Sequence, residues 1–225
     1  MDSAERLYCY RDLCRRVNRF FADHVADYCR HCQQVMDRVP GGGMAYELRS
    51  GVFPGCCHRG AGDIFRLEGV TDPSRLADGL VDLLQVERQK VVAARRTSAA
   101  TYELISRETG ARLHGEHCRY FGAEGCLLGD LKGPLCINFI CPPIRADLLQ
   151  VVDGDESVIG PEYDFLWIYQ TLAAISAGGR PEIEDQLLVL DQHLERLTQA
   201  CRHYLEAAAE YSLFACFCCG AADRG

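Results

Sequence analysis

Apolar positions recur every three or four residues over several stretches of the chain, which is the period of an amphipathic α-helix. One stretch covers residues 3–39. The prolyl and glycyl residues from Pro40 to Gly43 end it, because proline disfavours helical geometry before it and glycine has low helix propensity. No long stretch alternates between apolar and polar residues as a half-buried strand does. The pattern therefore predicts a mainly α protein.

Further segments have the same helical spacing. Asp72 and Pro73 suit the N-cap and first turn of a helix that reaches residue 95, and residues 97–108 extend it or form another. We expect a short helical turn at 146–152, because Pro142 and Pro143 disfavour a helix directly after Cys141. Residues 164–176 predict a largely buried helix. Residues 182–214 predict a long final helix whose near-heptad spacing suits packing along another long helix.

These elements predict one domain, residues 1–225, built as a helical bundle of four to five helices. Its 225 residues, 48% of them hydrophobic, are enough for a core that needs no disulfides. Two cysteine-rich metal-binding segments, 29–58 and 117–143, are inserted between the long helices. We expect their loops to converge at one end of the bundle.

The densest chemistry lies between His117 and Pro143. Four thiols occur within 24 residues among glycines and prolines, so the backbone must turn back on itself and can direct several sulfurs at one point. The spacing C-x7-C-x9-C-x4-C is neither that of a small ferredoxin nor that of a zinc ribbon. It indicates a metal-thiolate site without naming the metal. The candidate ligands here are Cys118, Cys126, Cys136 and Cys141.

Two other cysteine pairs are candidate ligands. Cys29 and Cys32 lie one helical turn apart, so they can bind one metal, or Cys32 can pack as a small apolar residue. Cys56 and Cys57 follow Pro-Gly, and adjacent cysteines rarely form a disulfide with each other, so at least one of them is expected to be a ligand. His58 is a weaker candidate, as a donor to a ligand or an exposed residue.

Three chemistries compete for these eight thiols. Iron–sulfur clusters use thiolates almost exclusively, structural zinc needs four ligands, and disulfides are disfavoured in a reducing compartment. Eight ligands are enough for two four-thiolate sites or for one site with spectators. Three further thiols at Cys216, Cys218 and Cys219 form a mobile metal-sensitive tail, an extra ligand donor or an inert terminus.

The segments 118–126 and 133–141 resemble the second half of the YkgJ-type cysteine-cluster proteins. In that family a C-x7-C segment is followed by a proline and then by Cys-x-x-aromatic-x-Cys, as in Gly133-Pro134-Leu-Cys136-Ile-Asn-Phe139-Ile-Cys141. The family is described as zinc- or iron-chelating and is predicted to carry an iron–sulfur cluster, and flagellin lysine N-methylases have a similar cysteine arrangement. The resemblance implies metal chelation by this chain, with one or two clusters of the 4Fe–4S type or, alternatively, Zn²⁺.

The remaining composition narrows the function. A formal net charge of -8 argues against a general nucleic-acid binder, because phosphate neutralisation needs clustered Lys and Arg. The N-terminal residues have no apolar signal core and no apolar run is long enough for a membrane span, so we expect a cytoplasmic protein. No hydrolase, metalloprotease or nucleotide-binding motif occurs. We expect electron transfer with a protein redox partner, with zinc-supported protein interaction as the alternative and a methylase-like cluster enzyme as a weaker one. Oligomeric state and enzymatic activity stay open.

Overall fold

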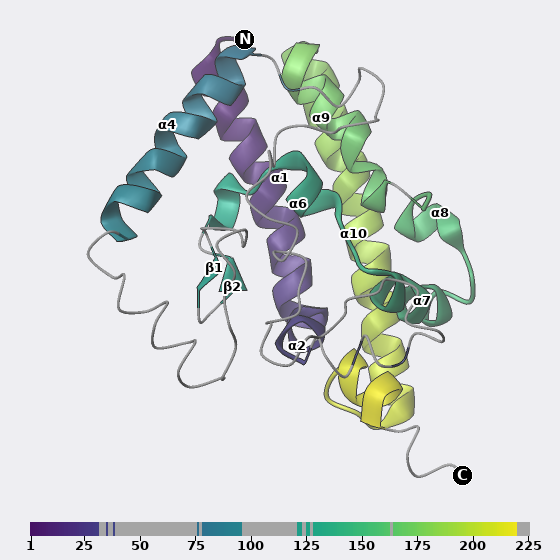
Figure 1. Cartoon of the computed structure of the whole chain (residues 1–225). Coiled ribbons are helices and arrows are strands. Elements are labelled where there is room, and N and C mark those ends of the chain that lie inside the picture. Colours follow the sequence, from purple (N-terminus) through teal and green to yellow (C-terminus); the bar gives the residue numbers. More distant parts are fainter. Residues whose placement is uncertain are drawn as a thin grey trace.

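The computed structural model of the chain describes residues 1–31, 35, 38, 76, 78–95, 121–122, 125–126, 128–162 and 164–219. Within these ranges the fold is mainly helical, and the predicted bundle of four to five helices is confirmed. No helix in the described ranges is long and apolar enough to cross a membrane. The longest helices are α1 (Ser3–His24), α4 (Asp78–Arg95), α7 (Pro142–Val151), α9 (Ile168–Ala177) and α10 (Arg180–Ala208) (Figure 1).

Helix α1 begins with a capping box. The Asp2 carboxylate accepts from the Glu5 amide at 2.8 Å, and the Glu5 carboxylate accepts from the Asp2 amide at 3.0 Å, which satisfies two amides of the first turn. The predicted continuous helix over 3–39 is wrong at Val25. That residue has φ -121° and ψ -15° and separates α1 from the short α2 (Ala26–Arg30). Both His24 and Val25 are buried, so tertiary packing fixes this bend without a proline or glycine.

Helix α1 lies between α4 and α10 and contacts both (Figure 1). The N-terminal start predicted for the second helix at Asp72 lies outside the described residues. The heptad-like face of α10 is buried against α1 and α9, as its spacing predicted. This face consists of Ile183, Leu187, Leu190, Leu194, Leu197 and Cys201. Together with the apolar faces of the other helices it forms one hydrophobic core.

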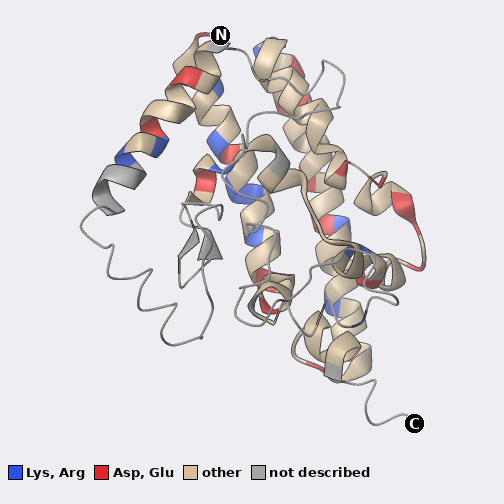
Figure 2. Cartoon of the chain, viewed as in Figure 1, with Lys and Arg blue, Asp and Glu red and all other residues tan. Residues whose placement is uncertain are grey.

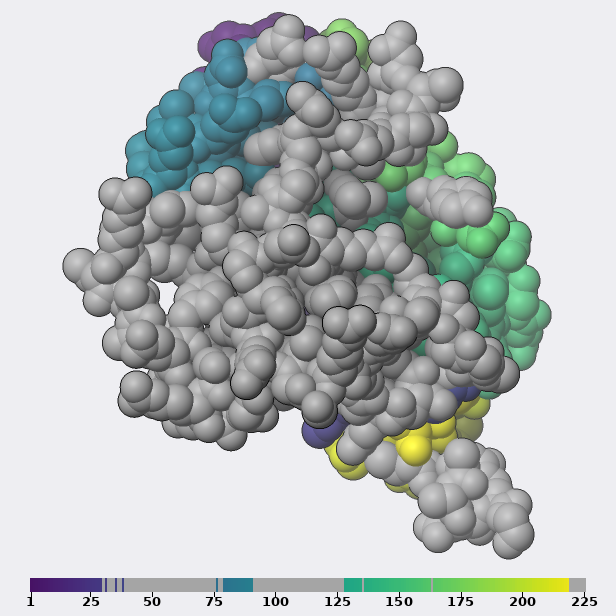
Figure 3. Space-filling model, in the orientation of Figure 1, coloured from purple at the N-terminus to yellow at the C-terminus, as the bar shows by residue number. Residues whose placement is uncertain are grey.

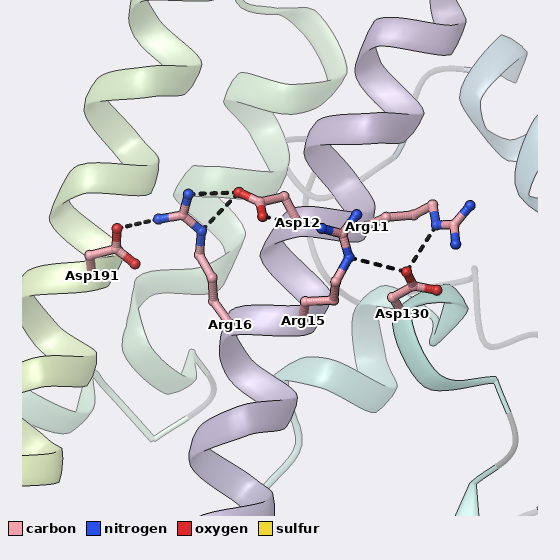
Figure 4. Close-up of polar contacts among 6 residues, drawn as sticks. All are labelled: Arg11, Asp12, Arg15, Arg16, Asp130 and Asp191. Carbon is pink, nitrogen blue, oxygen red and sulfur yellow. Dashed lines mark hydrogen bonds and ion pairs between the residues drawn. The ribbon is translucent and has the colours of Figure 1, made fainter.

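Ion pairs tie α1 to its neighbours on both sides (Figure 4). Arg16 bridges Asp12 on its own helix and Asp191 on α10. On the opposite side Arg11 and Arg15 reach Asp130. In Figure 2, acidic and basic residues both occur along α1 and along α4. Helix α1 is therefore the central element on which the rest of the described chain is assembled.

Helix α7 begins directly after the last thiol of the cysteine-rich segment. Cys141 is its N-cap, with extended backbone angles, and Pro142 and Pro143 occupy the first turn. The expectation that these prolines exclude a helix at this point is wrong, because the first-turn amides of a helix have no intrahelical partner and proline lacks only that amide. A turn follows α7. Asp153 and Gly154 adopt left-handed angles before α8 (Glu156–Ile159).

The helix predicted over 164–176 starts later than expected. Leu166 and Trp167 both adopt left-handed angles, with φ 53° and 57°, within the 3-10 turn η5 (Phe165–Trp167). Helix α9 can begin only after them, at Ile168. The buried Asp164 carboxylate accepts from the Tyr169 amide at 3.1 Å and so satisfies a backbone donor near this delayed start.

The final helix ends at Ala208 rather than continuing to residue 214. Ala209 is left-handed, with φ 53°, and terminates α10. The chain then enters a π-helical turn, η6 (Ala215–Cys219), which lies at the bottom of Figures 1 and 3. Leu213, Phe214 and Cys216 are buried. The terminal cysteine segment is therefore packed against the bundle as far as Cys218.

His24 makes the stability of the bundle depend on pH. It is 9% exposed, its ring lies 5.2 Å from that of Phe20, and neither ring nitrogen has a hydrogen-bond partner among the described residues. Burial lowers the pKa of His24 below 6.5; Asp23 opposes this shift and Arg202 adds to it. The unfolded chain then binds the proton more readily than the folded chain does. Burial of the neutral His24 ring therefore costs no stability above pH 6.5, and the free energy of unfolding falls as the pH drops below that value.

We expect the free energy of unfolding to fall between pH 7.5 and 5.5, by at most about 1.4 kcal/mol for each pH unit that separates the folded and unfolded pKa values. Urea titrations at both values measure this difference. The His24→Leu variant is expected to show a flatter pH dependence. Replacement of the exposed His203 by leucine is the matched control and leaves the pH dependence as in the wild type. An equal pH dependence in wild type and His24→Leu would contradict this assignment.

Candidate metal centre

The described part of the cysteine-rich segment reverses direction several times. Strands β1 (Phe121–Gly122) and β2 (Gly125–Cys126) pair antiparallel, with Phe121 opposite Cys126. The 3-10 turn η4 (Gly129–Leu131) and the five-residue helix α6 (Pro134–Asn138) follow. The expectation that glycines and prolines fold this segment back without a long helix is confirmed for these residues.

Side chains of α1 hold the middle of this segment. Asp130 accepts from Nε of Arg11 at 3.0 Å and from Nε of Arg15 at 3.2 Å (Figure 4). Asn18 donates from Nδ2 to the carbonyl of Gly129 at 3.0 Å and accepts from Nζ of Lys132 at 2.6 Å. Each of these contacts joins residues more than 100 positions apart in sequence. The cysteine-rich segment is thus fixed to the central helix within η4 and directly after it.

Buried donors satisfy the carbonyls at the end of η4. Tyr10, which is fully buried, donates its hydroxyl to the carbonyl of Lys132 at 2.5 Å. Arg88 of α4, 2% exposed, donates from Nε and Nη2 to the carbonyl of Leu131 at 2.8 and 2.6 Å. These carbonyls precede α6 and accept no backbone hydrogen bond from the described residues, so side-chain donors satisfy them. The stretch 129–132 is therefore held between α1 and α4, and we call this set of contacts the clamp.

The Tyr10→Phe variant tests this clamp. Removing the hydroxyl leaves the Lys132 carbonyl without its buried donor, and we expect a loss of about 1–2 kcal/mol in the free energy of unfolding. Urea unfolding measures it. Tyr8→Phe is the matched control on the same helix, because Tyr8 is 66% exposed, and it is expected to change stability by less than about 0.5 kcal/mol. Equal effects of the two variants would show that the Tyr10 hydroxyl does not hold the segment.

The structure gives side chains for three of the eight predicted ligands. Cys29 on α2 and Cys136 on α6 are exposed, and Cys141 at the start of α7 is half-buried; all three are thiols rather than disulfides. Cys126 is placed by its backbone in β2. Four other predicted ligands lie outside the described residues, namely Cys32, Cys56, Cys57 and Cys118. His58 lies outside them too. Within the part of the chain that the structure describes, no three His, Cys, Asp or Glu side chains form a group that could hold a metal.

Thiols from distant segments and residues of the clamp influence each other's pKa values. The pKa of Tyr10 is raised by burial and, to a smaller extent, by Cys14 and Cys136. Cys29 is an exposed residue, yet the protein around its sulfur still raises the pKa of its thiol by desolvation, and Lys132 partly opposes that rise. The charge of Lys132 therefore lowers the pKa of the Cys29 thiol on α2, and Cys136, four residues after Lys132, raises the pKa of Tyr10 on α1.

Cys14 is a thiol near the clamp that sequence reasoning placed in the apolar stripe of the first helix. Its sulfur lies 4.0 Å from the carbonyl of Lys132. Burial raises its pKa to about 12, against a smaller lowering by Lys132, so it is a neutral thiol at physiological pH. A signal for the clamp was present in the sequence, since Tyr10, Cys14 and Asn18 follow one another at intervals of four on one helical face.

A second polar cluster lies at the opposite end of α1, around Asp147 of α7. This carboxylate is 1% exposed. It accepts from both terminal nitrogens of Arg38, at 2.7 and 2.8 Å, and from the Tyr28 hydroxyl at 2.8 Å. Burial, followed by the charge of Asp147, raises the pKa of Tyr28, so its hydroxyl stays a donor. Sequence reasoning did not identify this cluster, because its members are separated by more than 100 residues.

Comparisons with known proteins add no relative: no family model matches the chain, and no curated protein and no solved structure was found to be similar to it. The resemblance to the YkgJ-type proteins therefore depends on the cysteine spacing alone. The geometry of the described residues carries the rest of the functional argument.

Proposed function

We propose that this chain is an iron–sulfur protein that transfers electrons to or from a protein partner. The observation that supports the proposal is the clamp at residues 129–132. It fixes the segment bearing Cys126, Cys136 and Cys141 to α1, and the ammonium group of Lys132 acts on the thiol of Cys29 from a separate segment. Lys132 thus links a thiol of a separate segment to the segment that bears the other proposed ligands.

The donor chemistry of the described residues fits such a centre. Cys29, Cys136 and Cys141 are accessible thiols, and thiolates are the usual ligands of iron–sulfur clusters. With these three, Cys32, Cys56, Cys57, Cys118 and Cys126 complete the proposed ligand set. When bound, bridging iron and sulfide supply a site that accepts and releases one electron.

The residues of the clamp have their own part in this function. The positive charge of Lys132 offsets part of the negative charge of nearby thiolates. The contacts with Asn18 and Tyr10 keep the segment in one conformation. A fixed protein environment favours rapid electron transfer because little of it must reorganise when the charge changes. Cysteines of the described region that are not proposed as ligands, such as Cys14 and Cys201, have pKa values raised by burial to about 12 and stay protonated.

Zinc is the second candidate, and the observation that favours it is the position of Cys29. The spacing Cys29-x2-Cys32 matches a zinc knuckle, and α2 is a helix of only five residues with Cys29 in its last turn. In that case the thiolates would hold the loops in place for contact with a protein partner. Both functions suit a reducing cytoplasm, where accessible cysteines persist as thiols.

Anaerobic purification followed by metal and sulfide analysis distinguishes the two. An iron–sulfur centre gives a brown protein with absorbance near ~400 nm that bleaches on reduction, with iron and acid-labile sulfide in similar amounts. A zinc centre gives a colourless protein with about one or two zinc ions per chain. A colourless protein that contains neither metal in stoichiometric amount would overturn the proposal.

A further inference from the structure

The C-terminal cysteine segment is docked on the end of the bundle by aromatic contacts. The ring of Phe214 stacks on that of His31 at 4.6 Å and meets Tyr28 edge-on at 5.8 Å. Phe217 stacks on Tyr204 of α10 at 5.3 Å. These contacts fix the residues on either side of Cys216 and the residue directly before Cys218.

Cys218 lies beside a guanidinium group that is itself held in place. Nη1 of Arg38 is 3.2 Å from the sulfur of Cys218, and the guanidinium carbon lies 6.0 Å from the ring centre of Phe217. The buried Asp147 binds Arg38 through both of its oxygens. Nη1 carries two hydrogens, so it can donate to Asp147 and to the sulfur at the same time. The cation therefore cannot turn away from the thiol without breaking a buried ion pair.

This arrangement differs from that of Cys9, a half-buried thiol on α1. Cys9 lines a groove between α1 and α10, and burial followed by the charge of Asp12 raises its pKa. A thiol next to a carboxylate resists ionisation, whereas a guanidinium hydrogen-bonded to sulfur favours the thiolate. Both thiols are half-buried, but a guanidinium nitrogen lies 3.2 Å from the sulfur of Cys218, whereas the largest charge effect on Cys9 is that of the Asp12 carboxylate, opposed in part by Arg180.

We propose that Cys218 is a reactive thiolate that hydroperoxides oxidise to sulfenic acid, with Arg38 as its positioning residue. The sulfur attacks one oxygen of the peroxide, an S–O bond forms, the O–O bond breaks, and the leaving oxygen takes up a proton and departs as water or an alcohol. Sulfur loses two electrons and the peroxide gains them. A low-molecular-weight thiol reverses the change, first by forming a mixed disulfide with release of water and then by thiol–disulfide exchange.

Alkylation of the native full-length protein by iodoacetamide, followed by mass spectrometry of the peptides, tests this site. At pH 7 we expect Cys218 to react at least about tenfold faster than Cys9 in the same sample. Dimedone added with hydrogen peroxide is expected to label Cys218 before Cys9. Because both thiols are measured in one folded wild-type sample, the comparison does not depend on the stability of any variant.

Variants of Arg38 show whether the guanidinium is responsible. Arg38→Met is expected to slow the alkylation of Cys218 to about the rate of Cys9, and Arg38→Lys is expected to retain part of the rate because it retains the positive charge. Equal rates at Cys218 and Cys9 in the wild type would overturn the proposal. So would a Cys218 that reacts only after a chelator has removed metal, because that thiol would then be a metal ligand. The outcome is independent of the iron–sulfur proposal, which none of these rates tests.

Discussion

The Asp147→Asn variant is expected to lose about 2–4 kcal/mol of its free energy of unfolding. The carboxylate is 1% exposed and holds both terminal nitrogens of Arg38. Asparagine has nearly the same volume but no charge and only one acceptor oxygen, so it cannot accept all the hydrogen bonds that the guanidinium and the Tyr28 hydroxyl donate to the two buried carboxylate oxygens. The expected loss is below that of a fully buried pair, because the Arg38 side chain is 30% exposed and solvent screens part of its charge. Urea unfolding measures the change.

Asp191→Asn is the matched control for this variant. Asp191 also pairs with an arginine, Arg16, but is 48% exposed, so we expect a loss below about 1 kcal/mol. Combining Asp147→Asn with Arg38→Met is expected to destabilise the protein by less than the sum of the two single changes, because it removes both charges of the pair. Equal losses at Asp147 and Asp191 would contradict a buried ionic link between α7 and Arg38.

Replacing either Cys136 or Cys141 with serine is expected to leave less than about a tenth of the metal bound to the wild type. A hydroxyl group does not ionise at neutral pH as a metal-bound thiol does, so serine is a poor replacement for a thiolate ligand. Neither variant disturbs a buried core position, because Cys136 is exposed and Cys141 is half-buried. Iron, zinc and sulfide analysis of the anaerobically purified variants measures the effect.

Cys9→Ser controls for the general effect of removing a thiol. Cys9 is half-buried, as Cys141 is, but it lies in the groove between α1 and α10, away from the clamp. We expect this variant to keep its metal in full. A normal metal content in both Cys136→Ser and Cys141→Ser would show that neither of these cysteines is a metal ligand.

The helices were largely predictable because an amphipathic helix carries its burial pattern in its own sequence. The face of α10 that includes Leu190 and Cys201 was identified from spacing alone and is buried. Helix ends were less predictable. The bend at Val25 and the left-handed angles of Leu166 and Trp167 involve no glycine or proline, so local propensity gives no sign of them. Packing against distant elements determines these features.

The candidate ligands can be proposed from the sequence, whereas the residues that hold the segment bearing them could not be. Cysteines are recognised as candidate ligands by their residue type, whereas the clamp consists of side chains that resemble ordinary surface residues, such as Asn18 and Lys132. Asp130 could have been paired with any nearby cation, and only the fold selects Arg11 and Arg15. Contacts over more than 100 residues depend on how helices pack, which a single sequence does not display.

Protection of exposed cysteines from alkylation tests the central claim, that thiols from separate segments bind one inorganic centre. Cys29 and Cys136 are both exposed and belong to different segments. In the native protein purified without oxygen we expect N-ethylmaleimide to modify both at least about tenfold more slowly than after removal of the metal with a chelator, because a metal-bound thiolate is a weak nucleophile. Cys9 is expected to react at the same rate in both states. Rapid modification of Cys29 and Cys136 at rates that metal removal does not change would contradict a shared centre.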